Sequence, residues 1–235
     1  MVNSNIEEHL AQGSLEVTGR LVDASNATLF AQCTFDEKTI SAIYKPIAGE
    51  RPLWDFPDGN LAQREYAAFL ISHLAGWNIV PTTVLRDGPF GEGMVQEWIE
   101  IDESIDLATF FSTDDYRLRR IALFDAVINN TDRKIGHLLP TEDGRLFGCD
   151  HGVTFHEEDK LRTVLWQWAA DEMTSEEREI LIALRWKIEE SESVFTHLIT
   201  VVEYQALLSR INSLLEKNLF PEPNPDWPAV PWPAF

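Results

Sequence analysis

Two short polar stretches of this chain contain side chains that could carry out chemistry. Residues 129–137 include Asp132, and residues 148–152 include Asp150. A carboxylate in a rigid loop can orient an attacking hydroxyl, and a second carboxylate at a strand end can bind a hard metal ion. Phosphoryl transfer needs both, because the protein mainly positions the reactants and neutralises charge. The pattern therefore predicts phosphoryl transfer, with Asp132 as base or orienting group and Asp150 as metal ligand. The alternative is two ordinary turn residues.

His137 lies five residues after Asp132, where a protein-kinase catalytic loop has an Asn that binds a second metal ion. A neutral imidazole can bind a divalent ion, although Mg²⁺ prefers oxygen ligands. We therefore expect His137 to be a metal ligand with Asp150, and Mn²⁺ or a single-metal site becomes conceivable beside Mg²⁺. In the alternative interpretation, His137 only forms a hydrogen bond with the backbone.

Lys45 stands in an apolar stretch that is typical of a strand, and Glu65 follows on an amphipathic helical stretch. A lysine among apolar residues is costly to bury unless it is paired. We predict that Lys45 binds nucleotide phosphates and that Glu65 orients it, as a strand lysine and a helix carboxylate do in kinases. Both residues could instead lie on solvent-exposed faces.

Two further stretches are candidates for binding the rest of a nucleotide. The turn at residues 23–27 lacks a G-x-G-x-x-G motif, but its amides, Asn26 and the Ser25 hydroxyl could cover phosphates, unless it is a plain hairpin. The end of the last strand in the first half of the chain could contact adenine through its backbone. This second stretch comprises Gln96, Glu97, Trp98 and Ile99.

Lys160 and Arg162 follow the second polar stretch in an acidic neighbourhood. Their charges could hold a phosphate or an acidic acceptor, and a solvated pair is the alternative.

The remaining elements predict how these side chains are positioned. Residues 1–100 are expected to form a small lobe of five strands with one clear helix over residues 61–75, after a short helical stretch at the start of the chain. Residues 101–220 are expected to form a mostly helical lobe, with a hairpin between the two polar stretches. Residues 221–235 contain many prolines and predict an extended tail. The predicted helices of the second lobe are residues 104–111, 114–129, 174–190 and 193–217.

Composition limits the partners of this 235-residue chain. Its net charge of −20 argues against nucleic acid and anionic membrane surfaces, which would repel it. Cys33 and Cys149 lack metal-ligand spacing and indicate a reducing compartment. The polar N-terminus does not resemble a signal peptide, and no apolar run is long enough to span a bilayer. We therefore predict a cytoplasmic protein without a membrane span.

Five short motifs occur in order along the chain: Tyr44-Lys45-Pro46, Arg64-Glu65-Tyr66-Ala67-Ala68, Val80-Pro81-Thr82-Thr83, Asn130-Thr131-Asp132-Arg133 and Asp150-His151-Gly152. Together they resemble a bacterial family related to phosphatidylinositol 3-/4-kinases within the protein-kinase-like superfamily, and more distantly HipA-type kinases. The resemblance implies an α+β, bilobal protein-kinase-like fold with ATP and Mg²⁺ or Mn²⁺ between the lobes. It also implies that Lys45 binds phosphates, Asp132 with Arg133 serves catalysis and Asp150 binds metal.

The expected function is therefore an ATP-dependent phosphotransferase that acts on a hydroxyl of an unidentified protein or small molecule. A nucleotide-binding pseudokinase without turnover is the alternative, because His137 replaces the usual Asn. The net charge makes an anionic lipid head group a poorer acceptor.

Overall fold

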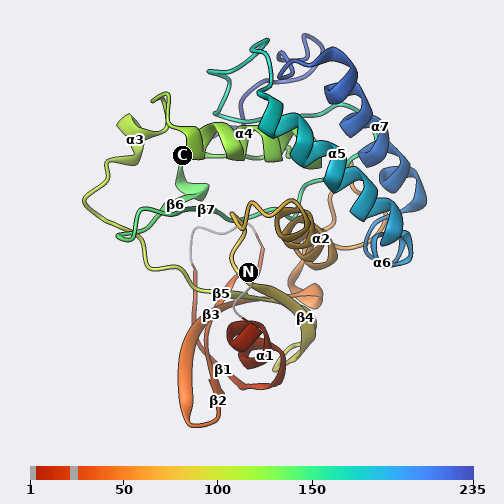
Figure 1. Ribbon diagram of the computed structural model, residues 1–235. Coiled ribbons are helices and arrows are strands. Elements are labelled where there is room, and N and C mark those ends of the chain that lie inside the picture. The colour runs from red at the N-terminus through yellow and green to blue at the C-terminus, as the bar shows by residue number, and fades with distance from the viewer. Residues whose placement is uncertain (1–3, 22–25) are drawn as a thin grey trace.

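The computed structural model describes residues 4–21 and 26–235 of the chain. Its N-terminal part is a five-stranded antiparallel sheet in the order β1-β2-β3-β5-β4, with helix α1 (Ser4–Gln12) packed beside it (Figure 1). The strands are β1 (Ser14–Arg20), β2 (Leu29–Phe35), β3 (Lys38–Pro46), β4 (Thr83–Gly88) and β5 (Gly91–Glu97).

Local sequence explains the central hairpin of this sheet. Asp36 and Glu37 connect β2 to β3 with φ angles of 46° and 62°, the positive values that a tight two-residue turn between twisted strands requires. In β2, Ala31 and Cys33 alternate with more exposed residues and bury their side chains in a small core between the sheet and α1. The hairpin thereby fixes the register of β3, the strand that carries Lys45.

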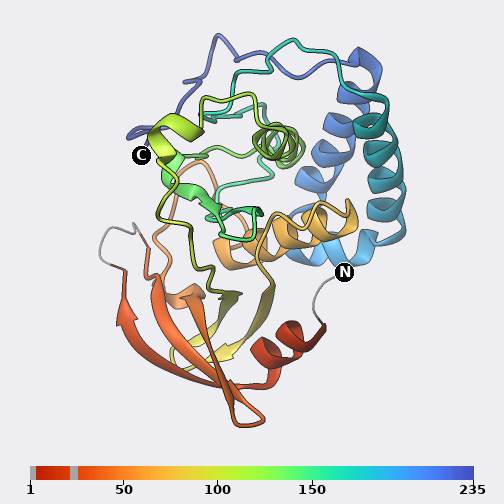
Figure 2. The same cartoon turned by 60° about the vertical axis from the view of Figure 1, so that its left-hand side comes forward.

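Helix α2 (Leu61–Leu74) lies between the sheet and the helices of the second half (Figures 1 and 2). Asn60 caps it by accepting a hydrogen bond from the Gln63 amide, and the Glu50 carboxylate accepts from the amides of Leu61 and Ala62. Helix α2 contacts β4 and β5, and its apolar residues join the main core of the second half.

The C-terminal part is mostly helical and contains the larger core. Helix α4 (Tyr116–Ile128) crosses this core, and its capping residue Asn129 has a φ of 52° that turns the chain into the loop that carries Asp132. The hairpin β6–β7 follows and leads to Asp150. The elements are α3 (Leu107–Phe110), α4 (Tyr116–Ile128), β6 (Leu138–Pro140), β7 (Leu146–Gly148), α5 (Ser175–Glu190), α6 (Glu192–Leu198) and α7 (Val201–Lys217).

The predicted α+β class is confirmed, with several corrections to its elements. The helix expected over residues 193–217 is two helices, because Thr200 caps α7 in a capping box with Glu203 and ends the preceding helix. The helix expected over residues 104–111 is limited to Leu107–Phe110 by the Asp106 cap. Helices α1 and α2 accompany the sheet, as predicted by the short helical stretch at the start of the chain and the helical pattern over residues 61–75. The residue boundaries of the lobes remain a prediction.

Within the residues that the structure describes, no helix combines the length and the apolar character needed to cross a membrane.

Candidate active site

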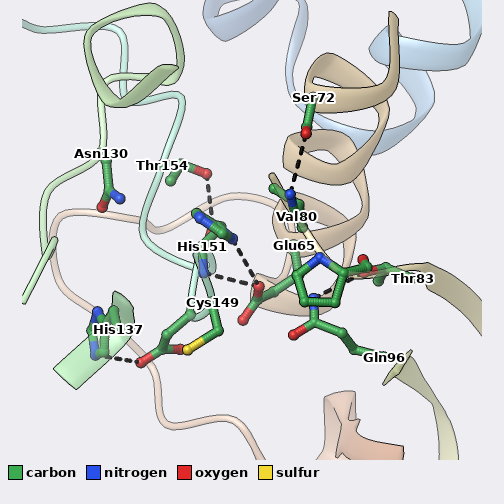
Figure 3. Close-up of polar contacts among 12 residues, drawn as sticks. Glu65, Ser72, Val80, Thr83, Gln96, Asn130, His137, Cys149, His151 and Thr154 are labelled. Carbon is green, nitrogen blue, oxygen red and sulfur yellow. Dashed lines mark hydrogen bonds and ion pairs between the residues drawn. The ribbon is translucent and has the colours of Figure 1, made fainter. Parts of the chain in front are cut away.

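Lys45, Glu65 and Asp150 meet in one ion cluster, although they lie on β3, on α2 and after β7. The Lys45 ammonium donates to Glu65 Oε1 at 2.5 Å and to Asp150 Oδ1 at 2.7 Å. Glu65 is 1% exposed and also accepts from the His151 backbone amide at 2.9 Å (Figure 3). These contacts join segments 105 residues apart in the sequence. The side chains of Lys45 and Glu65 are both largely buried, so neither residue lies on a solvent-exposed face.

The electrostatics of the cluster keep it charged. Burial lowers the pKa of Lys45, but the nearby carboxylates of Asp150 and Glu65 outweigh burial and raise it. The Lys45 charge in turn holds the pKa of Asp150 well below its usual range. Burial raises the pKa of Glu65, and Lys45 opposes that increase. Asp150 is consequently ionised at neutral pH, and one of its oxygens already contacts a cation.

A potential metal site lies on the other side of Asp150. Ligand atoms of Asp132, His137 and Asp150 all lie within 4.8 Å of one another, and His137 Nε2 is 3.5 Å from Asp150 Oδ2. Burial lowers the pKa of His137 to about 4, which leaves its imidazole neutral at pH 7. Two carboxylates and a neutral imidazole fit a divalent ion, and the nitrogen ligand suits Mn²⁺ better than Mg²⁺.

The lowered pKa of His137 predicts a loss of stability in mild acid. The folded value of about 4 lies below the unfolded value of about 6.5, so the unfolded chain binds the proton more readily. Stability is therefore full above about pH 6.5 and falls by about 3 kcal/mol from this group as the pH approaches 4. Urea unfolding between pH 7 and 4 should show a steeper loss in the wild-type protein than in His137→Asn. Equal slopes would contradict this assignment.

Asp132 stands in a loop that holds its backbone firmly. Its amide donates to Asn130 Oδ1 at 3.0 Å, and the Lys134 ammonium lies 3.4 Å from its Oδ2. Burial raises the pKa of Asp132, while Lys134 opposes this effect. A carboxylate that is partly exposed and whose pKa is raised can accept a proton from an attacking hydroxyl.

Arg133 requires a correction, because the predicted catalytic role does not fit its position. Its side chain is fully buried and forms a paired interaction with Asp125, with Nε 3.0 Å from Oδ2 and Nη2 2.9 Å from Oδ1. Its other nitrogen donates to the Cys149 carbonyl at 3.1 Å. Arg133 cannot contact a substrate from this position and is a positioning residue.

Asp125 is a central residue that the sequence motifs did not identify. It is fully buried on α4, and it accepts hydrogen bonds from Asn130 Nδ2 at 2.9 Å and from Thr163 Oγ1 at 3.3 Å as well as from Arg133. Through Asn130, these bonds reach the amide of Asp132. The one available signal was an acid within the apolar stretch Leu123-Phe124-Asp125-Ala126-Val127, since a carboxylate there must be paired.

His151 connects this network to the ion cluster. Its Nε2 accepts from Arg133 Nη2 at 2.7 Å, and its ring packs edge-to-face on Phe124. Burial and the Arg133 charge lower the pKa of His151 well below its usual value, so the ring is neutral. Figure 3 shows His151 beside Glu65, with dashed contacts from it to Glu65 and Thr154. Gly152, next along the chain, allows close approach to α2, since a Cβ there would be 3.1 Å from Leu61 Cβ.

The predicted adenine contacts are only partly compatible with the sheet. The Gln96 side chain is buried and donates to Thr83 Oγ1, and the amides of Glu97 and Trp98 donate to the carbonyls of Thr82 and Ser41. These three donors are therefore not free to bind adenine, so the predicted adenine contact is wrong for them. A contact through Ile99 or the carbonyl groups remains a prediction.

The predicted phosphate-covering turn is described only in part. Ser25 lies outside the described residues, whereas Asn26 accepts from the Arg51 amide at 2.9 Å. Asn26 lines a pocket together with Lys45, Asp150 and Gly152. This pocket places Asn26 on the same side of the molecule as the ion cluster.

Comparison with known proteins supports the architecture. The chain is 40% identical to protein Rv2133c of Mycobacterium tuberculosis over 97% of this chain and 96% of that protein. Two similar solved structures are hydra Fam20 with sugar (TM-score 0.63, 13% identity, 91% of this chain and 87% of that one) and the Golgi casein kinase with Mn/ADP bound (TM-score 0.61, 14% identity, 91% and 74%). At these identities, the likeness establishes a kinase-like fold. No family model matches the chain, and the relation to phosphatidylinositol 3-/4-kinases is not confirmed.

Proposed function

The chain belongs to the family of Mycobacterium tuberculosis protein Rv2133c, and we propose that it is an ATP-dependent phosphotransferase acting on a hydroxyl group. One observation carries the proposal: Lys45 joins Glu65 of α2 to Asp150, directly beside the cluster of Asp132, His137 and Asp150. A cation for phosphates, a divalent-metal site and a carboxylate for the acceptor are the parts that phosphoryl transfer requires.

Each side chain has a distinct task in this proposal. Lys45, held by Glu65, binds the phosphates of ATP, and Asp150 with His137 would hold a divalent ion. When bound, such an ion neutralises charge on the transferring phosphoryl group. Asp132 accepts the proton of the acceptor hydroxyl or orients it in line with the phosphate, while Lys134 stabilises the carboxylate. Asp125 and Arg133 keep the loop in position from within the core.

A nucleotide-binding pseudokinase is the second candidate, and His137 is the observation that favours it. An imidazole in place of an amide oxygen weakens Mg²⁺ binding, since this ion prefers oxygen ligands. Such a module would bind ATP through Lys45 and Asp150 without turnover.

Nucleotide binding tests the feature that both candidates share. ADP with Mn²⁺ at about 100 times its Kd should stabilise the wild-type protein by about 2.7 kcal/mol, measured by thermal unfolding. Lys45→Met should lose most of this stabilisation, while Arg185→Gln, a charge change on the exposed face of α5, should retain it. No stabilisation by any nucleotide with either ion would overturn both candidates.

The identity of residue 137 should set the metal preference. We expect the wild-type protein to hydrolyse ATP faster with Mn²⁺ than with Mg²⁺, and His137→Asn to shift this ratio toward Mg²⁺ by about tenfold. Steady-state rates with each ion measure the ratio. Mn²⁺ affinity in the presence of ADP, measured by electron paramagnetic resonance, gives a readout independent of turnover. An unchanged ratio together with unchanged Mn²⁺ affinity would exclude His137 as a ligand.

A further inference from the structure

The segment around Arg162 lies directly alongside the loop that carries Asp132. The Arg162 amide donates to the Asn130 carbonyl at 2.9 Å, and its Nε donates to the Thr131 carbonyl at 2.7 Å. The Arg133 amide donates to the Arg162 carbonyl at 3.1 Å. Arg162 is therefore fixed next to Asp132, and its charge is one of those that lower the pKa of that carboxyl.

Arg162 has no acidic partner among residues 4–21 and 26–235, although the chain contains 39 acidic and 19 basic residues. Its two terminal nitrogens have no acceptor within the same described residues, since only Nε is bonded. In a protein with a net charge of −20, a guanidinium beside the proposed catalytic carboxylate is available to bind an anion.

Lys160 adds a second cation to this site. The Lys160 and Arg162 side chains lie together, because both contact the ring of Trp227. Lys160 is only 6% exposed, which excludes a solvated pair, and its ammonium lies 3.0 Å from His156 Nε2. Its one ion-pair partner in the described chain, Glu158, is exposed and 3.4 Å away.

Tryptophan rings enclose the two cations. Trp227 lies 5.1 Å from the Lys160 ammonium and 5.3 Å from the Arg162 guanidinium, and Trp54 lies 5.5 Å from Lys160. The indole Nε1 of Trp227 is buried and has no hydrogen-bond acceptor within the described residues. A buried donor without an acceptor is costly, and an anion that reaches the indole nitrogen would satisfy it.

We propose that Arg162, Lys160 and the Trp227 indole N–H form an anion site that recognises a phosphate or carboxylate on the acceptor. The inference rests on the proposed function and adds the class of its acceptor, a small hydroxy compound that carries an anionic group. The anion site holds that group while the hydroxyl reaches Asp132. Trp54, which is 83% exposed, lies beside Lys160 on the solvent side of the site.

The C-terminal tail favours a small acceptor over a protein chain. An extended peptide gains affinity by pairing its backbone with free amides. At this site, the tail already pairs with them, because the Thr163 amide donates to the Ala229 carbonyl at 3.1 Å and the Ile135 amide to the Ala234 carbonyl at 2.9 Å. Figure 2 shows the tail returning to this side of the molecule. A peptide would have to displace it.

Inorganic phosphate is the probe that tests this site. The protein is first saturated with Mg²⁺ and a non-hydrolysable ATP analogue, so that phosphate cannot occupy the nucleotide site beside Lys45. Calorimetric titration should then show phosphate binding that weakens about tenfold in Arg162→Gln and in Lys160→Gln. Arg162→Lys should recover part of the affinity, and the surface control Arg185→Gln should match the wild type.

Two outcomes would overturn the inference and leave the proposed function standing. In the first outcome, the analogue binds but the affinity for phosphate is the same in Arg162→Gln and Lys160→Gln as in the wild type. A wild-type protein that binds the analogue but no phosphate would count equally. The second concerns the acceptor class: glycerol 3-phosphate should bind the analogue-loaded protein more tightly than an acidic serine peptide, and the reverse order would refute a small acceptor. Loss of analogue binding itself would instead count against the proposed function.

Discussion

Replacing Asp150 by Asn is expected to reduce ATP turnover about 1,000-fold while leaving the fold intact. The substitution removes the ionised oxygens that face Lys45 and His137, on which charge stabilisation of the transferred phosphate depends. Asp150 has a φ of 60°, and Asn tolerates this left-handed conformation well, so the backbone should not change. Because the side chain is half exposed, water can solvate the new amide, and losing the ion pair with Lys45 should lower the free energy of unfolding by only about 1 kcal/mol.

Steady-state rates of ADP formation at several ATP concentrations give kcat/KM, which measures this effect. Thermal unfolding monitors the fold. Asp143→Asn is the matched control, because Asp143 lies on the exposed turn of the neighbouring β6–β7 hairpin. The control should keep wild-type activity. Turnover above about a tenth of the wild-type rate in Asp150→Asn would contradict the role assigned to this carboxylate.

Replacing Arg133 by Met is expected to destabilise the protein by about 3–5 kcal/mol, because it leaves the Asp125 carboxylate buried without its cation. Urea unfolding measures this loss. The double variant Arg133→Met/Asp125→Leu should recover much of the stability, since both buried charges are removed together. Turnover should nevertheless remain low in the double variant, because Asn130 and the loop around Asp132 lose their anchor.

Comparing the single and the double variant separates the effect of the buried pair on stability from its effect on the position of the Asp132 loop. A loss below about 1 kcal/mol in Arg133→Met would show that the buried pair contributes little. Full activity in a stable double variant would show that Asp125 does not position the catalytic loop.

The ion cluster implies a link between nucleotide and metal binding. In this structure, Lys45 bonds to Asp150, the residue proposed to hold a metal ion. The phosphates of a nucleotide would attract Lys45 and release that carboxylate oxygen. Binding of the two ligands is therefore expected to be cooperative.

The sequence indicated the charged residues that meet at the site, but it did not indicate the buried residues that hold them in position. Lys45 could be identified because a charge in an apolar strand must be paired, Glu65 because it follows on an amphipathic helical stretch, and Asp150 because it stands in a short polar stretch. The structure brings these three residues together. Asp125 was missed because the helix around it has the apolar pattern of ordinary core, and only the tertiary structure shows the buried Arg133 that pairs with it.

Other errors came from interactions that a single chain segment does not reveal. The break before α7 depends on a capping box at Thr200 within an otherwise continuous helical pattern. The amides of Glu97 and Trp98 belong to the sheet, which sequence position alone could not establish. The cations around Trp227 depend on a tail that returns from a distant part of the chain.

Release of the labelled γ-phosphate from ATP is the most direct test of the central claim. The wild-type protein, incubated with γ-labelled ATP and either Mn²⁺ or Mg²⁺, should form ADP and pass the label to an added hydroxy compound or to water. Chelation of the metal, Asp132→Asn and Asp150→Asn should each abolish this release. Tight ATP binding without any release, under either ion, would contradict a phosphotransferase and identify a nucleotide-binding module.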